Sequence, residues 1–585
     1  MRPLRYLAIA FDPQHWDDDR LLSIAVRVAM PIAYRTERLI VIASDPGEVN
    51  RTPIGNGATI GKIFRKNGTK PKSTSAMREK AQFSEELISN FWGSYIYVAD
   101  GATGVVILRD PSGGLPCYQA EGVGFAAFAS DAPLLVSAGL LRPTVDLEVV
   151  GQTLYFSQLP QVETAITGLK QLLPGHMLTW DRQRKEISQH WNPWNHVEAD
   201  FSESTAERSE RLGQILRGTH AVWAGCYPHS LLGLSGGLDS SIVAICLAEA
   251  SQRVECLTAV TSDPVGDERL YARMVCEQIG AQLLECEYSI DAIDLDRSVA
   301  EAMPCPNGKS HEMAYNRAVR DAAQRLNVDA FFVGAGGDNV FYLTHSARPI
   351  VDRYRTEGLS RGLIDTISDV CTITGASIWR VLREAIRVGT RGSRGATGWH
   401  TDIDYLDADF VADKAVRPFG HPWLDVPGEA PLGKVGHISM ILRAMNNIEH
   451  RDKELAVPMI SPLLSQPVIE ACLGIPSWEA CEGGVDRSSA RRAFADALPP
   501  RVLGRHGKGS PDGFVGDFIH RHRAEIADRL LSGQLAANRL VDRKALEAAL
   551  GEGAPLQRND CARIMELVDT EAWIAHWSSP SLLPA

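Results

Sequence analysis

One stretch, residues 231–241 (LLGLSGGLDSS), constrains the fold of this 585-residue chain more than any other. An apolar run ends at Leu234, a glycine turn follows, and a helix is expected from about Ser240. A strand that passes through a tight turn into a helix is the repeating unit of a parallel sheet covered by helices. The same alternation continues downstream, so we predict a parallel α/β domain that becomes mostly helical after about residue 355. The predicted strands are 230–234, 254–260, 282–288 and 330–333, and the predicted helices are 240–250, 267–279 and 313–325.

The turn in this stretch also has the residue types of a phosphate-binding loop. Two glycines allow the backbone to approach a ligand closely, and the free N–H groups at the head of a helix attract an anion. Ser235, Ser240 and Ser241 add hydroxyl donors, whereas Asp239 would repel a bare phosphate unless a Mg²⁺ ion lay between them. A Walker loop is excluded, because no glycine–lysine pair has the G-x-x-x-x-G-K-[ST] spacing. The alternative is a purely structural connection with Asp or Ser as the helix cap.

The first 200 residues show a different pattern. Short alternating runs, separated by Gly, Pro, Asn and Asp, predict a β-rich region. The lysine- and glycine-rich stretch 50–74 is predicted to be an exposed loop, and the polar segment 195–210 to lead into a helix. We therefore divide the chain into domains at 1–205 and 206–585. The predicted strands of the first domain are 6–11, 39–43, 95–98, 105–108 and 124–129.

Composition excludes several classes of protein. The net charge of −12 argues against a nucleic-acid-binding coat. The 11 cysteines contain no CxxC pair, which favours reduced thiols in a cytoplasmic protein over a disulfide framework or a zinc site. The N-terminal apolar run is soon broken by acidic residues, so it is not a secretion signal, and the most apolar stretch, 122–141, contains Asp131 and Pro133 and cannot span a membrane.

The motif at 235–241 (SGGLDSS) resembles the pyrophosphatase loop of the asparagine synthetase superfamily, whose members cleave ATP between the α and β phosphates. Residues 333–339 (VGAGGDN) resemble the second signature of that superfamily, SGxGxDE, with Asn339 in place of Glu. The resemblance implies that Asp239 and Asp338 hold Mg²⁺ and that the first loop binds the leaving pyrophosphate. The residues that it assigns to ATP are Leu234, Ser235, Gly236, Gly237, Asp239, Ser240, Ser241, Val260 and Gly334.

Residues 505–510 (RHGKGS) resemble the segment of the same superfamily that carries a catalytic lysine. The resemblance implies that Lys508 offsets the negative charge that develops on the adenylate and at the tetrahedral centre. The alternative for a single lysine is a solvated surface position.

The N-terminal region resembles the glutaminase domain of these enzymes at 91–93, 109–118 and 173–176. This implies an N-terminal-nucleophile-type αββα sandwich, followed by the pyrophosphatase domain with its parallel sheet. The glutaminases use an N-terminal cysteine as nucleophile, but residue 2 here is Arg2 and the first cysteine is Cys117. We therefore expect that this domain does not release ammonia from glutamine. Its expected role is to stabilise the structure or to present the substrate.

Two branches of the superfamily form amides without an ammonia source, namely β-lactam synthetases and lasso-peptide cyclases. The catalytic tyrosine of the first branch would fall at Ala335, whereas GAGGDNVF and the segments 303–306 and 486–494 resemble the second branch. That resemblance implies a macrolactam synthetase that uses ATP to join an Asp or Glu side chain of a precursor peptide to the N-terminal amine of the same peptide.

For this activity we expect a large cavity lined by the helical region after residue 355. The resemblance also implies two partners, a leader peptidase and a leader-peptide-recognition protein. A small-molecule amide synthetase and a non-catalytic nucleotide-binding scaffold remain alternatives.

Overall fold

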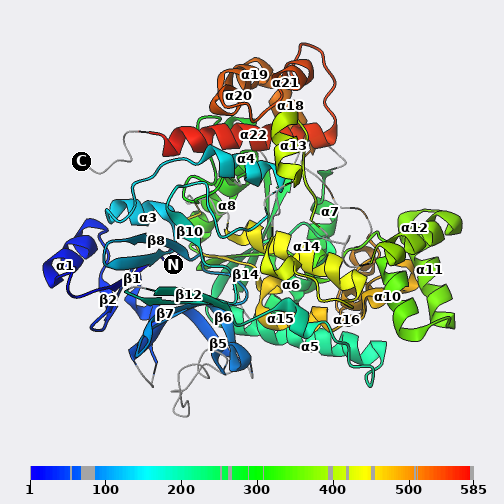
Figure 1. Cartoon of the computed structure of the whole chain (residues 1–585). Helices are drawn as coiled ribbons and strands as arrows, with labels where there is room; N and C mark the ends of the chain where they lie inside the picture. Colours follow the sequence, from blue (N-terminus) through cyan, green and yellow to red (C-terminus); the bar gives the residue numbers. More distant parts are fainter. Residues whose placement is uncertain are drawn as a thin grey trace.

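The computed structural model describes residues 2–52, 56–66, 86–157, 159–182, 184–250, 253–260, 266–287, 289–306, 308–392, 399–416, 420–449, 455–505, 507, 509 and 512–579. In these residues the strands form two six-stranded sheets, built from the N-terminal part of the chain, and one five-stranded sheet, built from the remainder. The two N-terminal sheets lie together at one side of the molecule. The helices from α18 (Asp512–Arg521) to α22 (Arg558–Trp577) form a separate layer above α14 (Leu432–Glu449) (Figure 1).

All paired strands of the two N-terminal sheets run antiparallel. The first sheet has the order β10-β8-β9-β1-β3-β2 and the second the order β12-β11-β7-β6-β5-β4. The strands of the first sheet are β1 (Tyr6–Phe11), β2 (Ile32–Arg35), β3 (Leu39–Ala43), β8 (Tyr118–Gly122), β9 (Phe125–Ala129) and β10 (Leu169–Gln171). Those of the second are β4 (Val49–Arg51), β5 (Asn56–Arg65), β6 (Phe91–Gly101), β7 (Gly104–Arg109), β11 (His176–Asp181) and β12 (Arg184–Gln189).

The two sheets are stacked face to face because both faces of the central strands are apolar. In β1, Tyr6 and Ala8 point into a core shared with the second sheet, whereas Leu7 and Ile9 point to the helical side. The short helices α1 (Asp18–Arg27), α3 (Ala132–Ser137) and α4 (Leu147–Tyr155) belong to this region.

The outer face of the second sheet packs on helices of the C-terminal part, as Phe64 against Trp223 shows, with ring centroids 5.1 Å apart. Trp92 of the same sheet also packs on Trp223, at 6.1 Å. Helices therefore cover both stacked sheets, which confirms the predicted N-terminal-nucleophile-type sandwich.

One prediction for this domain was wrong. Within the stretch 50–74, expected to be an exposed loop, β5 (Asn56–Arg65) is a ten-residue strand that pairs along its whole length with β6. Its Ala58 and Ile60 are fully buried between the sheets. The prediction failed because glycines in a sequence usually indicate a loop. Here Gly61 is part of the strand, since it has φ +97° and lies against the backbone of Ser94, where a side chain has no room. Residues 67–74 lie outside the described part of the chain.

The third sheet is parallel and has the order β15-β14-β13-β16-β17. Its strands are β13 (His229–Gly233), β14 (Arg253–Val260), β15 (Gln282–Glu287), β16 (Ala330–Val333) and β17 (Met459–Ile460). The first four and the helices between them, α6 (Leu238–Glu249), α7 (Arg269–Ile279) and α8 (Glu312–Leu326), lie where the sequence predicted them. The strand β17 was not predicted, because two residues carry no periodicity and their partner β16 is more than a hundred residues away.

The remainder of the chain is mainly helical. Its helices are α5 (Thr205–Ala224), α9 (Gly337–Val340), α10 (Arg348–Glu357), α11 (Arg361–Thr374), α12 (Ile378–Arg391), α13 (Ala408–Val416), α14 (Leu432–Glu449), α15 (Gln466–Leu473), α16 (Ser488–Ala493), α17 (Pro500–Leu503), α18 (Asp512–Arg521), α19 (Arg523–Ser532), α20 (Gln534–Ala537), α21 (Arg543–Ala549) and α22 (Arg558–Trp577). No helix in the described ranges combines the length and the apolarity that crossing a membrane requires.

The helix α5 begins at the predicted division between the domains. Ser204 and Glu207 close a reciprocal cap there, in which Ser204 N donates to Glu207 Oε2 at 2.7 Å and Glu207 N to Ser204 Oγ at 3.3 Å. The division at 205/206 itself stays a prediction. All 11 cysteines lie in the described residues, and none of them forms a disulfide bond.

Candidate active site

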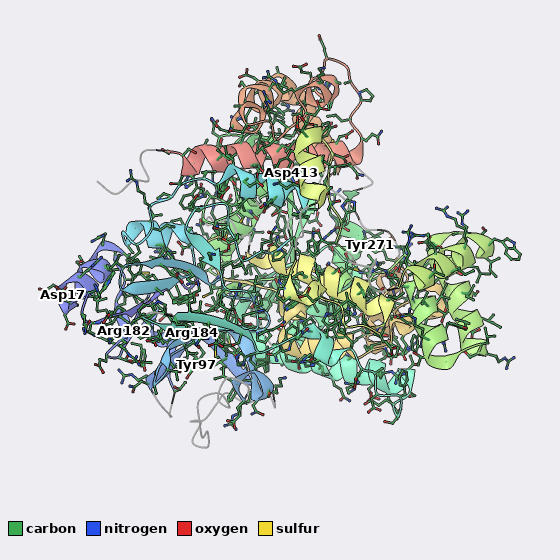
Figure 2. The ribbon with its side chains drawn as sticks, in the orientation of Figure 1. Asp17, Tyr97, Arg182, Arg184, Tyr271 and Asp413 are labelled. Carbon is green, nitrogen blue, oxygen red and sulfur yellow. The ribbon has the colours of Figure 1, made fainter. Side chains whose placement is uncertain are left out.

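The glycine loop lies at the carboxyl end of the central strand β13. Leu234 continues the strand by donating its N–H to Leu257 O at 2.8 Å, and α6 begins four residues later. Gly236 has φ +66°, and a Cβ atom there would lie 2.4 Å from Cβ of Tyr271 and 2.6 Å from the backbone N of Ala272. The loop is therefore pressed against the start of α7 and requires glycine at this position. Figure 2 shows Tyr271 well away from Tyr97 and Arg184 of the N-terminal sheets.

The serines of the loop have different environments. Ser235 Oγ lies 3.1 Å from Ser240 Oγ and accepts the Gly237 N–H at 3.3 Å, so these hydroxyls shape the turn itself. Ser241 is fully buried, and its Oγ has no hydrogen-bond partner among the described residues. Ser235 and Ser240 thus lie on the loop, whereas Ser241 lies beneath it.

A second glycine-rich loop follows β16, the neighbour of β13 in the sheet. A Cβ atom on Gly334 would lie 2.6 Å from the backbone N of Ser240, and one on Gly337 would lie 2.2 Å from Cγ of Asp239. The two loops are therefore in direct contact, as expected for adjacent parallel strands whose carboxyl ends meet at one edge. This contact brings Asp338, in the first turn of α9, beside Asp239 in the first turn of α6.

One arginine joins the two carboxylates. Arg487 Nη1 lies 3.0 Å from Asp239 Oδ1 and 2.5 Å from Asp338 Oδ1, and Arg487 Nε lies 2.7 Å from Asp486 Oδ1. Burial alone would lower the pKa of Arg487, but the three carboxylates outweigh it and raise that pKa above its usual value. In the sequence, Arg487 stands out only as part of the segment 486–494. On the sequence alone it is therefore assigned no role.

The carboxylate pair fits a magnesium ion that is completed by a nucleotide. Mg²⁺ in nucleotide enzymes is bound by one or two carboxylates together with phosphate oxygens. Asp239 and Asp338 contact a single nitrogen, so both are within reach of one cation. In the described part of the chain no group of three or more His, Cys, Asp and Glu side chains is arranged to hold a metal without such additional ligands.

The segment with the predicted catalytic lysine is tied to the glycine loop. Glu268 Oε1 accepts Arg505 Nη2 at 2.7 Å and the Gly509 N–H at 3.0 Å, and Arg505 Nη1 donates to Ser235 O at 3.2 Å. The guanidinium of Arg505 also stacks 4.2 Å above the ring of Tyr271. Arg505 and Gly509 flank Lys508 in the sequence, but Lys508 itself lies outside the described residues.

The residues assigned to adenosine lie at the same edge of the sheet. Leu234 is buried in the core at the end of β13, and Val260 is the partly buried last residue of β14. Gly334 follows β16, so the structure brings all three to the carboxyl ends of adjacent strands. Their contact with a base or ribose stays a prediction.

Asn339 has a structural contact of its own. It stands where the family signature has glutamate, and its Nδ2 donates to the backbone carbonyl of Met440 in α14 at 2.7 Å. A glutamate has no proton to donate at neutral pH, so the amide at this position ties α9 to α14 in a way that the usual residue cannot.

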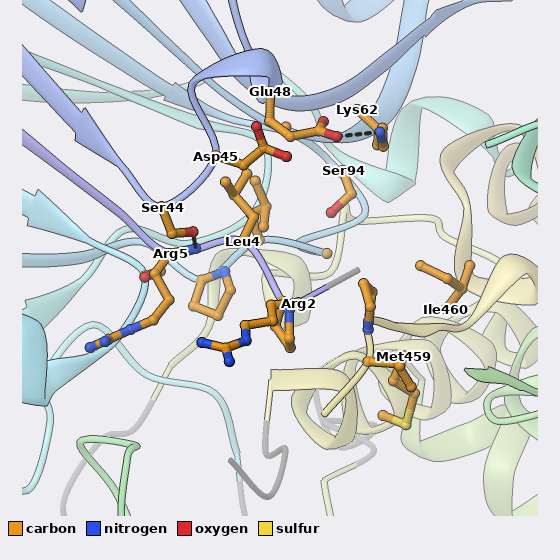
Figure 3. Close-up of a pocket in the computed structure, with 18 of the residues that line it drawn as sticks. Arg2, Leu4, Arg5, Ser44, Asp45, Glu48, Lys62, Ser94, Met459 and Ile460 are labelled. Atoms are coloured by element: carbon orange, nitrogen blue, oxygen red, sulfur yellow. Dashed lines mark hydrogen bonds and ion pairs between the residues drawn. The ribbon is translucent and has the colours of Figure 1, made fainter. Parts of the chain in front are cut away.

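The structure also contains a cavity of about 790 Å³ between the N-terminal sheets and residues 455–465. Arg2, Asp45 and Lys62 line one side of it, and Met459 and Ile460 line another (Figure 3). The prediction of a cavity lined by the helical region after residue 355 is thus only partly matched, because much of this cavity's wall comes from the N-terminal domain.

Most of the charge at the polar end of this cavity is paired internally. Arg5 Nη2 lies 2.7 Å from Asp131 Oδ1, and Lys62 is bonded to Glu48.

The apolar end of the cavity reaches the vicinity of the carboxylates. Leu464 lines the cavity and packs against Gly336, where a Cβ atom would lie 2.5 Å from Leu464 Cγ. Gly336 caps the helix α9 that carries Asp338. At this point the side chain of Leu464 therefore lies between the cavity and the second glycine-rich loop.

Comparison with known proteins gives matches over both parts of the chain. Residues 231–575 match the asparagine synthase family, and residues 75–191 match the glutamine amidotransferase domain. No curated protein sequence matches. Two solved structures, both aligned at a TM-score of only 0.21, are glutamine phosphoribosylpyrophosphate amidotransferase from B. subtilis with ADP and GMP (13% identity, 56% of this chain, 90% of that chain) and an allosteric regulatory enzyme of purine biosynthesis (12%, 56% and 89%). The first family match spans more than half of the chain and includes both aspartate-bearing loops, and the chain therefore belongs to the asparagine synthase family.

Proposed function

We propose that this member of the asparagine synthase family is an ATP-dependent macrolactam synthetase that forms AMP and pyrophosphate. Its substrate would be a precursor peptide, in which an Asp or Glu side chain is joined to the N-terminal amine of the same peptide. The observation that carries the nucleotide part of this proposal is that Asp239 and Asp338 meet at the head of the SGGLDSS loop, within reach of one cation.

The side chains and backbone of the site suit adenylation of a carboxylate. The N–H groups at the head of α6 would bind the leaving pyrophosphate. Asp239 and Asp338 would hold Mg²⁺, which when bound neutralises charge on the phosphates. The peptide carboxylate attacks the α-phosphorus and expels pyrophosphate, and the peptide amine then attacks the acyl carbon and expels AMP. Lys508 would offset the negative charge that grows in both steps.

The N-terminal domain supports an amine source other than glutamine. Cys117 is the one cysteine in the sequence of residues 1–205, and it is fully buried in the core between the two sheets, where it cannot reach a substrate. An amine from the peptide itself avoids the need for free ammonia. Well-oriented intramolecular reactions reach effective molarities of about 10⁵–10⁸ M, so holding the peptide in its reactive shape is the main task of such an enzyme.

The cavity supports a substrate larger than ammonia or an amino acid. Its volume of about 790 Å³ lies within the range of roughly 300–1,000 Å³ that encloses drug-sized ligands, which corresponds to a short peptide segment. Ala335, at the place where β-lactam synthetases carry their tyrosine, favours a peptide over a small-molecule ring closure. We include a leader peptidase and a leader-peptide-recognition protein as partners that would supply the peptide.

The deciding experiment supplies Mg²⁺-ATP and a leader-free candidate precursor peptide, and follows peptide mass and nucleotide products. Loss of one water from the peptide with release of AMP supports cyclisation, whereas release of ADP contradicts the assignment of the glycine loop. Asp239→Ala and Asp338→Ala are each expected to abolish turnover. Lys508→Ala is expected to lower kcat far more than it lowers the affinity for ATP. An equal loss of both would contradict the catalytic role proposed for Lys508.

A further inference from the structure

The strongest unexplained contact in the candidate site is that of Arg487 with both magnesium-binding candidates. We propose that Arg487 is a built-in cation that neutralises Asp239 and Asp338 when no metal is bound and that turns to the phosphates when Mg²⁺-ATP enters. This inference rests on the proposed nucleotide site and deepens it, because it makes metal binding and nucleotide binding depend on each other.

The geometry makes the arginine and a metal mutually exclusive. A single atom, Arg487 Nη1, contacts both Asp239 Oδ1 and Asp338 Oδ1, at 3.0 and 2.5 Å. A magnesium ion held by these same oxygens would need the space that this N–H group occupies. The Asp239 side chain is only 10% exposed and that of Asp338 is 29% exposed, so water screens the repulsion between the two carboxylates incompletely and a cation between them is favourable.

The opposite side of the guanidinium provides a pivot. Arg487 Nε is bonded to Asp486 Oδ1 at 2.7 Å, and Asp486 is fixed in turn by Arg491, whose Nη2 lies 2.9 Å from the same oxygen. Arg491 Nε also donates to the backbone carbonyl of Asp486 at 2.7 Å. The side chain can therefore release Nη1 while its Nε stays anchored.

The backbone of Arg487 has an uncommon conformation. Its φ of +51° lies in the left-handed region, directly before α16, and this conformation is uncommon for a residue with a side chain. Since Asp486 and Arg491 hold the segment on both sides, the fold maintains this conformation and with it the approach of the guanidinium to the two loops.

The planar fork of an arginine matches phosphate oxygens better than any other cationic side chain does. Free Mg²⁺ would have to displace the arginine without offering it a new partner, whereas Mg²⁺-ATP brings the metal for the carboxylates and an anion for the arginine together. The structure thus predicts weak binding of free metal and strong binding of the metal–nucleotide pair.

The test uses the full-length protein and three variants, Arg487→Gln, Arg487→Lys and, as a control, Arg211→Gln on α5, where Arg211 pairs with Glu203 just before the helix. Binding of Mn²⁺ alone is measured by electron paramagnetic resonance, and binding of a non-hydrolysable ATP analogue with Mg²⁺ by calorimetry. Arg487→Gln is expected to bind Mn²⁺ alone at least tenfold more tightly than the unmodified chain does and the Mg²⁺ analogue at least tenfold more weakly. The control is expected to change neither.

Unchanged or weaker Mn²⁺ binding by Arg487→Gln would overturn the proposal, and so would unchanged binding of the Mg²⁺ analogue. If Arg487→Gln fails to fold, Arg487→Lys is used instead, because lysine keeps the charge but lacks the planar guanidinium. This variant is expected to bind Mn²⁺ alone weakly and to lose affinity for the Mg²⁺-bound ATP analogue. Tight binding of Mn²⁺ alone by Arg487→Lys would contradict the proposal. Adding Asp338→Asn to Arg487→Gln is expected to abolish the gained Mn²⁺ binding. If the unmodified chain binds no Mg²⁺ analogue at all, the proposed nucleotide site itself fails, and the Mn²⁺ measurement still decides the role of Arg487.

Discussion

At the scale of single residues, close contacts of the two loops require glycine at two positions of the candidate site. Gly236 lies against α7, and Gly337 lies against Asp239. Both glycines fall within motifs that a reader of the sequence recognises. Arg487 could not be assigned in this way, since its contacts with Asp239 and Asp338 join parts of the chain 248 and 149 residues apart. Pairings over such distances depend on the complete fold and leave no local pattern.

Gly337 provides a direct test of how closely the loops must approach. In Gly337→Ala the new Cβ would lie 2.2 Å from Cγ of Asp239, so the carboxylate has to move. We expect ATP-dependent pyrophosphate release to fall at least 100-fold, with a loss of roughly 1–3 kcal/mol in the free energy of unfolding. The control is Gly218→Ala on the exposed side of α5, where a Cβ atom meets no other atom within 4 Å. This substitution is expected to stabilise the protein by about 0.5–1 kcal/mol, because alanine favours a helix more than glycine does. Normal activity of Gly337→Ala would show that Asp239 does not need its present position.

At the scale of helices and strands, hydrophobic periodicity predicted the elements whose burial is regular. The strands β1, β3 and β14 and the helix α6 have the predicted positions to within two residues. The helix α3 and the strand β5 were missed, because a six-residue helix and a glycine-containing strand lack a clear period. The helix α1 was missed although its buried residues Leu21, Ile24 and Ala25 have helical spacing. Short elements and elements fixed mainly by tertiary contacts were thus the ones that the sequence did not place.

The helix α22 contains a buried carboxyl group that gives the protein a specific pH dependence. Asp569 is fully buried and accepts hydrogen bonds from Ser298 Oγ at 2.7 Å, Ser310 Oγ at 3.2 Å and the Val299 N–H at 3.2 Å. Burial raises the pKa of Asp569 from 3.8 to about 7, although these bonds favour the ionised form. Between these two pH values the folded chain keeps a proton that the unfolded chain has lost, so the free energy of unfolding falls as the pH rises through this window and is flat above it.

Asp569→Asn removes the titrating group while it retains the shape of the side chain. We expect urea unfolding of the unmodified protein to lose on the order of 2 kcal/mol between pH 5 and pH 7 from this group, and the variant to lack that part of the slope. Asp528→Asn, an exposed position on the nearby helix α19, is the control and is expected to keep the full slope. An identical slope in Asp569→Asn and the unmodified chain would assign the dependence to other groups.

At the scale of the whole molecule, the N-terminal domain and the synthetase region are joined by contacts that neither could satisfy alone. Glu470 of α15 accepts Trp191 Nε1 at 3.0 Å and pairs with Lys66 Nζ at 2.9 Å, and both of these partners belong to the N-terminal domain. Trp194 Nε1 donates to Trp423 O at 2.9 Å across the same boundary. The N-terminal domain is thus built into the fold of the whole chain, and it forms much of the wall of the cavity.

We predict that narrowing this cavity impairs the peptide and not the nucleotide. Ser44 lies on the exposed rim of the cavity, where its Oγ accepts the Arg5 N–H at 2.9 Å. The substitution Ser44→Trp adds bulk toward the cavity, and the loss of this hydrogen bond lowers the free energy of unfolding by about 1 kcal/mol. The expected result is a rise of at least tenfold in KM for the peptide, with KM for ATP unchanged. Ser368→Trp, on the exposed surface of α11 and outside the cavity lining, is expected to alter neither. An unchanged peptide KM in an active Ser44→Trp enzyme would place the peptide elsewhere, because a substrate that occupies the cavity cannot share it with an added indole ring.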